Sequence, residues 1–372
     1  MSKRIYLDYN ATAPVMASVW AALSETSVLD VNPSSQHTSG KTAHKEIKQV
    51  ESFLYNTFGL SVESHNLLFH SGATEAFNTL FNLSGGINAF IYFTTDHPAI
   101  KFIANSLESN GVEVHCLNVG PDGMFDISAA QVKLKDYADK FDEVWINTTY
   151  MNNETGVVWP LAEISKLKVA NNIKLHVDAV QMIGKVSENL LLSDHIDAYT
   201  FSGHKFGALK GVGFSFYKKA ISIAPLILGG GQQNFLRSGT LNYHGILSLK
   251  YALNGRDFGR EFLETKKLKD KILQLIANYP KLSVIPSQSS NTICLLHETK
   301  RADEMLILFD MNGLDVSSGS ACSSGSVEAS HVLEAMGLTN KAKNNIRLSL
   351  SYSHISLEKD LLTRLQNIFA KL

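Results

Sequence analysis

The chain has 372 residues, of which 44% are hydrophobic and 19% charged, and its formal net charge is −1. This profile is typical of a folded globular protein of more than one domain and excludes a disordered chain. The near-zero charge gives no general attraction to nucleic acid or to anionic membranes, and the sequence contains no basic stripe. We therefore expect neither a nucleic-acid nor a membrane partner.

Signals that would direct the chain out of the cytoplasm are not expected. The first ten residues, MSKRIYLDYN, lack the apolar stretch of a signal peptide. Apolar runs such as Ala224–Leu228 are far shorter than the roughly 20 residues that a membrane helix needs. The three cysteines, Cys116, Cys294 and Cys322, lie far apart and form no CxxC. We therefore expect no disulfide framework, no metal site and a reducing, cytoplasmic location.

Short apolar runs alternate with longer amphipathic stretches through the first two thirds of the chain. The predicted strands are Asn66–Phe69, Ala89–Phe93, Val112–Asn118, Glu143–Thr148, Ile173–Asp178, Ala198–Phe201 and Val212–Tyr217. Helical spacing separates most of them, as in Ala99–Glu108 and Leu161–Ala170. The alternation predicts an α/β fold, a mostly parallel seven-stranded sheet with helices on both faces. Only about ten residues separate the last two strands, too few for a helical crossover, so the seventh is expected to be antiparallel.

The pattern changes after Gly245. The sequence predicts a charged helix over 246–279, then a strand at Asn291–Leu296 and helices at Ala302–Met311 and Glu358–Lys371. We therefore predict a large domain over residues 15–250 and a smaller α+β domain formed by 1–14 and 251–372. The smaller domain carries Cys322 in a Ser/Gly-rich stretch, 317–326, whose composition predicts a mobile loop.

Polar residues follow the ends of the predicted parallel strands, which is where ligands bind in such sheets. Small residues at Ser71-Gly72-Ala73-Thr74 open a helix and suit a phosphate, although such a turn is more often only a helix cap. His97 after the second strand could stack on a flat ring or be structural. Asn152 and Asn153 after the fourth could be turn formers or ligands.

Two charged residues follow the fifth and sixth strands. Asp178, if buried, needs a donor or cationic partner such as a protonated pyridine nitrogen, or it caps the next helix. Lys205 could form a Schiff base, although most lysines are solvated charges. All these groups fall at one end of successive strands, and this joint placement favours a single active site.

These residues belong to stretches that resemble the cysteine desulfurases, within the class V aminotransferases and the fold type I enzymes of pyridoxal 5'-phosphate (PLP). The stretches cover nearly the whole chain: Tyr6–Pro14, Asn32–His37, Ser71–Glu75, Asp96–Ala99, Asn152–Gly156, His176–Gln181, Phe201–Lys205, Arg237–Thr240, Ser317–Ser323 and Ile346–Ser349. The resemblance implies a PLP-dependent enzyme that converts L-cysteine to L-alanine as a homodimer. Lys205 would anchor PLP, Cys322 would take the sulfur as a persulfide, and His97 would manage protons.

The resemblance also implies the binding residues. PLP would contact Ala73, Thr74, His97, Asp178, Gln181, Ser202, His204, Lys205 and, from the neighbouring subunit, Thr240. Asn153 and Arg347 would bind the substrate carboxylate, which the planar guanidinium matches. The sulfur would pass to an acceptor protein of iron–sulfur cluster assembly or tRNA thiolation.

The choice of reaction depends on Cys322, because PLP folds host many reactions. Cys116 and Cys294 lie in apolar runs and are predicted to be buried, whereas Cys322 lies among serines and glycines. An ordinary class V aminotransferase-like enzyme needs no such thiol, but a selenocysteine lyase is less clearly distinguished. A protein that only binds a sulfur carrier would be expected to have lost Lys205 or Asp178.

The chain departs from the family at two places. Phe206-Gly207-Ala208-Leu209 stands where the family usually has an aromatic residue, glycine and proline. Gln232-Gln233-Asn234-Phe235 stands where it commonly has Glu and Arg. We expect these changes to affect substrate access, the dimer contact or the rate more than the class of reaction.

Overall fold

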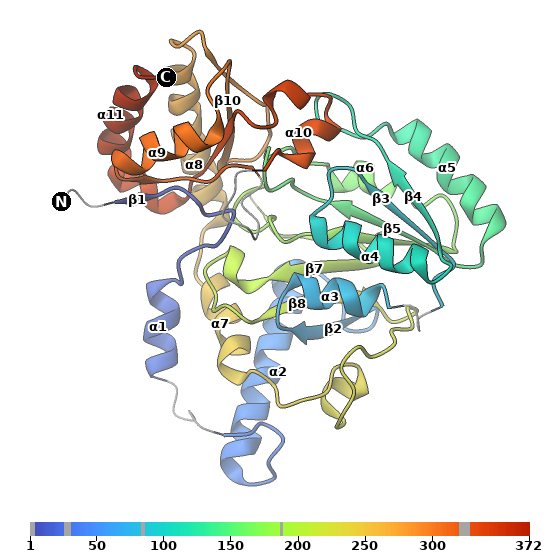
Figure 1. The fold of residues 1–372 in the computed structure, drawn as a ribbon. Coiled ribbons are helices and arrows are strands. Elements are labelled where there is room, and N and C mark those ends of the chain that lie inside the picture. The colour runs from blue at the N-terminus through green and yellow to red at the C-terminus, as the bar shows by residue number, and fades with distance from the viewer. Residues whose placement is uncertain (1–3, 26–30, 83–85, 187–188, 320–327) are drawn as a thin grey trace.

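A computed structural model of the protein describes residues 4–25, 31–82, 86–186, 189–319 and 328–372. A seven-stranded sheet with the order β2-β8-β7-β6-β5-β3-β4 forms its centre (Figure 1). The strands are β2 (His65–His70), β3 (Ala89–Phe93), β4 (Glu113–Leu117), β5 (Val144–Thr149), β6 (Ile173–Asp178), β7 (Ala198–Ser202) and β8 (Gly213–Lys218).

The strand directions place several strand ends at one edge. Neighbouring strands among β4, β3, β5, β6 and β7 are parallel, while β8 is antiparallel to both β7 and β2. The predicted α/β class, the mostly parallel seven-stranded sheet and the antiparallel seventh strand are confirmed. Because β2 runs in the same direction as β7, the carboxyl ends of β2, β3, β5, β6 and β7 share an edge.

Helices cover both faces of this sheet. One face packs against α3 (Ala73–Leu80) and α4 (Pro98–Ser109); the other side holds α1 (Ala17–Ser24), α2 (Thr38–Phe58), α5 (Ile127–Lys140), α6 (Leu161–Ser165) and α7 (Tyr243–Leu253). Trp145 of β5 packs in the apolar core on the side of α3 and α4, and its neighbour Ile146 packs in the core on the opposite side. Successive side chains of a strand point to opposite faces, so both faces need apolar cover.

A second, smaller group of elements lies beside one end of the sheet. It contains α8 (Phe258–Ile276), α9 (Ala302–Met311) and α11 (Glu358–Phe369) around an antiparallel sheet of order β12-β10-β9, with β9 (Leu282–Val284), β10 (Thr292–His297) and β12 (Asn345–Ser349). The N-terminal β1 (Ile5–Tyr6) pairs with β11 (Leu314–Asp315), and Figure 1 shows it beside the orange and red elements. Ile5 and Leu7 share a core with Phe309 and Leu348. The proposed division into domains at residues 14 and 250 stays a prediction.

Short elements complete the described chain: α10 (His331–Ala335) and the 3-10 helices η2 (Gly203–Lys205), η3 (Gln232–Phe235), η4 (Thr339–Lys341) and η5 (Tyr352–Leu357). No helix in the described ranges has the length and apolarity to cross a bilayer.

Two predicted helices differ from the structure. The single helix expected over 246–279 is two helices, because Asn254 is extended (ψ 134°), Gly255 adopts a left-handed conformation (φ +75°) and Asp257 starts α8 by accepting a hydrogen bond from Arg260 N. Left-handed backbone cannot continue an α-helix. The helix predicted over 161–170 ends at Ser165, beyond which the N–H groups of 166–168 donate three residues back instead of four.

Candidate active site

A cavity of about 590 Å³ lies at the shared edge of the sheet. It is lined by most of the predicted site residues: Ala73, Thr74, His97, Asn153, Asp178, Gln181, Ser202, His204, Lys205 and Arg347. Thr240 is exposed and does not line the cavity. Cys322 lies outside the described residues, but Gly319, three residues before it, lines the cavity. One space therefore collects groups from the ends of β2, β3, β5, β6 and β7, and from β12.

The amine of Lys205 is held by the N-terminal segment. Its Nζ donates to Asn10 O (2.8 Å) and Ala11 O (2.9 Å). The Asn10 side chain is itself fixed, because it donates to Asn153 O and to Thr292 Oγ1. Sequence reasoning assigned no role to this segment, although it lies within the stretch Tyr6–Pro14 that carried the family resemblance. The segment places the lysine at the cavity wall.

A buried carboxylate ends β6. Asp178 is 7% exposed, and its Oδ1 accepts one hydrogen bond from Val180 N (2.9 Å). Burial raises the Asp178 pKa to about 6, although the nearby positive charge of Lys205 opposes this shift. A cationic nitrogen in the cavity would favour the carboxylate form. The site thus suits a protonated heterocycle.

Two histidines of the cavity wall are held neutral at pH 7. Burial and the positive charge of Lys205 lower the pKa of both His97 and His204 to about 4. His97 Nδ1 accepts from Ala99 N (3.2 Å), which leaves the proton of the neutral ring on Nε2. His204 Nδ1 lies 3.2 Å from Thr12 Oγ1.

The start of α3 offers free backbone donors to the cavity. Its N-cap is Gly72, which provides no side-chain cap, so the first N–H groups at Ala73 and Thr74 remain available for an anion. A Cβ added at Gly72 would lie 3.9 Å from Ser202 Oγ, so both residues border the same space. Glu75 does not compete for the site, because its carboxylate accepts from Ser71 N (2.8 Å) and from Arg237 Nε (2.9 Å).

Arg347 of β12 closes the cavity from the smaller group of elements. It is 3% exposed, donates from Nη2 to Asp8 Oδ1 (2.7 Å) and from Nη1 to Asn153 O (3.3 Å). Its buried Nε has no partner among the described residues. A buried donor without a partner is costly, and a guanidinium that lines the cavity is a group that can bind a carboxylate. Asp8, which sequence reasoning missed, keeps the guanidinium in place.

Neither described cysteine is suited to be a nucleophile. Burial raises the pKa of the Cys294 thiol in β10 to about 12 and also raises that of Cys116 in β4. Neither lines the cavity. Because the thiolate is the reactive form, both thiols are inert as they stand.

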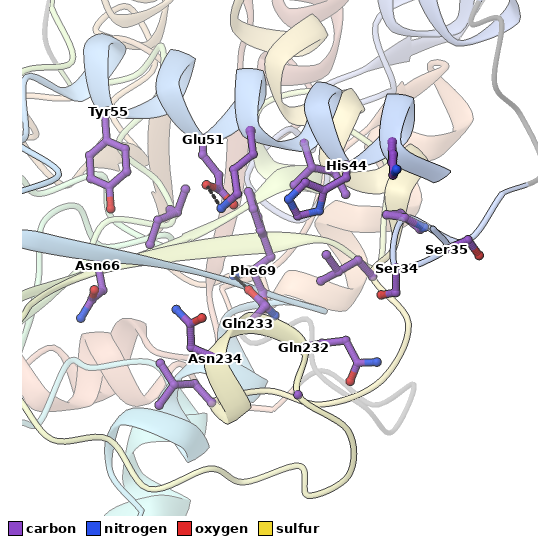
Figure 2. Close-up of a pocket in the computed structure, with 18 of the residues that line it drawn as sticks. Ser34, Ser35, His44, Glu51, Tyr55, Asn66, Phe69, Gln232, Gln233 and Asn234 are labelled. Atoms are coloured by element: carbon purple, nitrogen blue, oxygen red, sulfur yellow. Dashed lines mark hydrogen bonds and ion pairs between the residues drawn. The ribbon is translucent and has the colours of Figure 1, made fainter. Parts of the chain in front are cut away.

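A second cavity of about 730 Å³ lies between α2, β2 and the segment 231–241. Figure 2 shows Gln233 beside Phe69 in this region. The Gln233 carboxamide accepts from Phe69 N (2.7 Å) and donates to Phe69 O (2.8 Å), so it pairs with the free edge of β2. A glutamate, common here in the family, has no donor for the second bond. Gln233, Asn234 and Phe235 all have positive φ, 47°, 56° and 63°; the two hydrogen bonds help to hold this strained conformation.

The residues after Lys205, where the chain also differs from the family, make backbone hydrogen bonds of their own. Ala208 N donates to Gly203 O (3.1 Å) and Leu209 N donates to Ser248 Oγ (3.1 Å), so a proline at either position would lose a hydrogen bond. Gly207 adopts φ +94°, which suits a glycine there.

The fold and this cavity define a class of protein, and comparison with known proteins agrees. The chain matches the aminotransferase class-V family over residues 5–358. It is 35% identical to cysteine desulfurase 2 of Trichormus variabilis, over 97% of this chain and 92% of that relative. The chain therefore belongs to the cysteine desulfurases of the class-V aminotransferase family.

Solved structures show the same fold. A NifS-like protein from Rickettsia africae superposes with a TM-score of 0.87 at 26% identity, covering 99% of both chains. A structure described as SspA in complex with cysteine superposes with a TM-score of 0.77 at 26% identity, covering 93% of this chain and 98% of that one.

Proposed function

We propose that this cysteine desulfurase uses PLP, held by Lys205, to convert L-cysteine to L-alanine and to place the sulfur on Cys322 as a persulfide. The observation that carries the proposal is the cavity itself. Lys205, buried Asp178 and the free N-terminus of α3 all line one space, which matches an aldehyde, a pyridine nitrogen and a phosphate. The SspA neighbour described as a complex with cysteine supports the substrate.

The residues present fit the cofactor. The phosphate would lie on the N–H groups of Ala73 and Thr74, with Ser202 and His204 beside it. Asp178 would pair with the ring nitrogen, Gln181 would donate to the ring hydroxyl, and His97 would stack on the ring. When bound, PLP supplies an electron sink for the carbanion at the substrate Cα.

The chain's own residues would then move the proton and the sulfur. Arg347 and Asn153 hold the substrate carboxylate, and Lys205 takes the Cα proton. The Cys322 thiolate attacks the substrate sulfur, so an S–S bond forms and the Cβ–S bond breaks. The electron pair of the broken Cβ–S bond stays on Cβ, which takes up a proton to give alanine. The products are one alanine and one Cys322 persulfide for each cysteine consumed.

Cys322 is the proposed acceptor because the other two thiols have raised pKa values and lie outside the cavity. It follows cavity-lining Gly319 by three residues, a chain length that spans up to about 10 Å. Cys322→Ser should keep the yellow colour of bound PLP and lose the persulfide, which mass spectrometry of the trapped protein detects. Cys116→Ser is the matched control and should retain it. A persulfide on Cys116 in the Cys322→Ser protein would contradict the assignment.

The overall reaction has a direct test. The purified protein should show the visible absorbance of bound PLP and release alanine from L-cysteine, with equimolar sulfide when a reductant is added. Protein that holds PLP but yields neither product would refute the reaction. The relatives are named for cysteine, so a selenocysteine lyase is the less favoured alternative; a higher kcat/KM for L-cysteine than for L-selenocysteine would exclude it.

We also propose a cytoplasmic homodimer that passes sulfur to an acceptor protein, an iron–sulfur scaffold or a tRNA-thiolation carrier. Thr240 is exposed in the single chain, and Leu228 and Phe235 nearby are 80% and 69% exposed. A partner subunit that covers these side chains would let Thr240 reach the partner's phosphate site. Light scattering should give twice the chain mass. Mixed dimers of Thr240→Ala and Lys205→Ala chains test whether Thr240 acts across the interface.

A further inference from the structure

Lys185 is a buried lysine close to the candidate active site. It is 6% exposed, and its Nζ donates to Gln181 Oε1. The ion pairs within the described part of the chain do not include it. Burying an ammonium group without a carboxylate is unfavourable. The buried amine of Lys185 therefore depends on its hydrogen bond to Gln181.

The amine fixes the orientation of the Gln181 carboxamide. A lysine ammonium only donates hydrogen bonds, so the oxygen of the amide must face Lys185. The amide nitrogen then faces the other way, and Gln181 Nε2 donates to Asn10 O (2.9 Å). Asn10 O also accepts from Lys205 Nζ (2.8 Å). Lys185, Gln181, Asn10 and Lys205 thus form one hydrogen-bonded series.

Without Lys185 this orientation would lose one of its two anchors, and only the hydrogen bond from Gln181 Nε2 to Asn10 O would remain. The two ends of a carboxamide are nearly equal in size, so only hydrogen bonds decide between them. Burial and the positive charges of Lys205, Arg347 and Arg256 lower the Lys185 pKa well below its usual range. A neutral amine can donate to the amide oxygen as well, and the carbonyl Asn10 O, which only accepts, keeps the amide nitrogen on its own side in either protonation state.

We propose that Lys185 is a positioning residue that aims the Gln181 N–H group at the ring oxygen of the cofactor. The inference rests on the proposed PLP function, because Gln181 lines the cavity and its donor would meet that oxygen. A flipped amide would present its own oxygen to the ring oxygen and to Asn10 O, and both contacts would be repulsive.

Lys269 provides a matched control. It is 4% exposed, and its Nζ donates to Ser287 O, Ser287 Oγ and Ser289 O, at 3.2, 2.8 and 2.7 Å. Those oxygens belong to the loop before β10 and do not line the candidate active site. Lys269 therefore has the burial of Lys185 without its contact to Gln181.

The test compares K185M, K269M, Q181A and the double variant K185M/Q181A with the wild-type holoenzyme. The readouts are the dissociation constant of PLP, the pH midpoint of the visible absorbance of bound PLP, and Tm. We expect K185M to weaken PLP binding by about 10- to 100-fold, the effect of one hydrogen bond to a charged group, and to shift the pH midpoint. K269M should lower Tm. Its dissociation constant for PLP should stay within twofold of the wild-type value, and its pH midpoint should equal that of the wild type within error.

The double variant decides whether Lys185 acts through Gln181. In the Q181A background, K185M should weaken PLP binding by less than twofold. The K185Q variant, which retains a donor, should lose less affinity than K185M. If K185M lowered PLP affinity equally in the wild-type and Q181A backgrounds, the inference about Lys185 would be wrong. It would also be wrong if K185M left PLP affinity and the pH midpoint unchanged. Neither result would affect the proposed function. Wild-type protein that binds no PLP would overturn the proposed function with it.

Discussion

The seven-stranded sheet and the three-stranded sheet contribute to the cavity in different ways. The large sheet supplies a buried carboxylate, neutral histidines, a helix N-terminus and the lysine, all from strand ends that share one edge. The small sheet supplies Arg347 from a strand interior, together with an apolar core around Phe309 and Leu348. The large sheet therefore forms the proposed cofactor site, and the small sheet brings one cation, Arg347, to the same cavity.

The largest effect is expected at Lys205. Lys205→Ala removes the amine that anchors PLP and moves the Cα proton, so kcat/KM should fall by about 10⁴-fold or more. Absorbance spectra and alanine release measure both roles. Lys210→Ala is the control, because this lysine also lines the cavity but makes neither proposed contribution. An unchanged spectrum of bound PLP in Lys205→Ala would show that another lysine is the anchor.

The small core should be sensitive to cavity creation. Phe309 is fully buried, so Phe309→Ala should cost about 3–5 kcal/mol of unfolding free energy. Phe102→Ala, at a side chain 73% exposed, should cost little. If the two groups of elements are separate domains, calorimetry of Phe309→Ala will show a new low-temperature transition while PLP absorbance persists. A single transition at which the absorbance is lost as well would contradict that division.

Arg347→Lys tests the contribution of the small sheet to substrate binding. Lysine keeps the charge but loses the planar set of donors, so KM for L-cysteine should rise by about 10- to 100-fold. The spectrum and affinity of PLP should change little. Arg364→Lys is the control, since Arg364 forms an ion pair with Asp360 in the first half of α11 and neither residue lines the cavity. Weaker PLP binding without a change in KM would place Arg347 with the cofactor instead.

The smallest expected effect is on the unfolding free energy of the smaller group of elements at acid pH. Burial lowers the His354 pKa to about 4, below its ordinary value of 6.5. The unfolded chain then binds the proton more readily, so this stabilisation is complete above pH 6.5 and is lost as pH falls toward 4. Between pH 7 and pH 5 the contribution of His354 to the unfolding free energy should fall by about 2 kcal/mol. Urea titrations of His354→Gln should show a smaller decrease over this interval; an equal decrease would exclude His354 as its source.

The sequence by itself determined the large sheet and most of the site. Alternating apolar runs predicted seven strands with close to the observed bounds, since buried strands must be apolar and helices must cover them. Polar residues at strand ends predicted which side chains meet, because parallel strands end at one edge. Asp178 and Lys205 can be identified in this way from their positions in the sequence alone.

Only the tertiary structure decided which distant segments complete the cavity. No local pattern indicates that the carbonyls of Asn10 and Ala11 hold Lys205, that Asp8 fixes Arg347, or that Lys185 contacts Gln181. The break at Gly255 depends likewise on a backbone conformation that helical spacing does not register. Long-range contacts arise when cores pack together, and a sequence read locally contains the side chains of such contacts but not their partners.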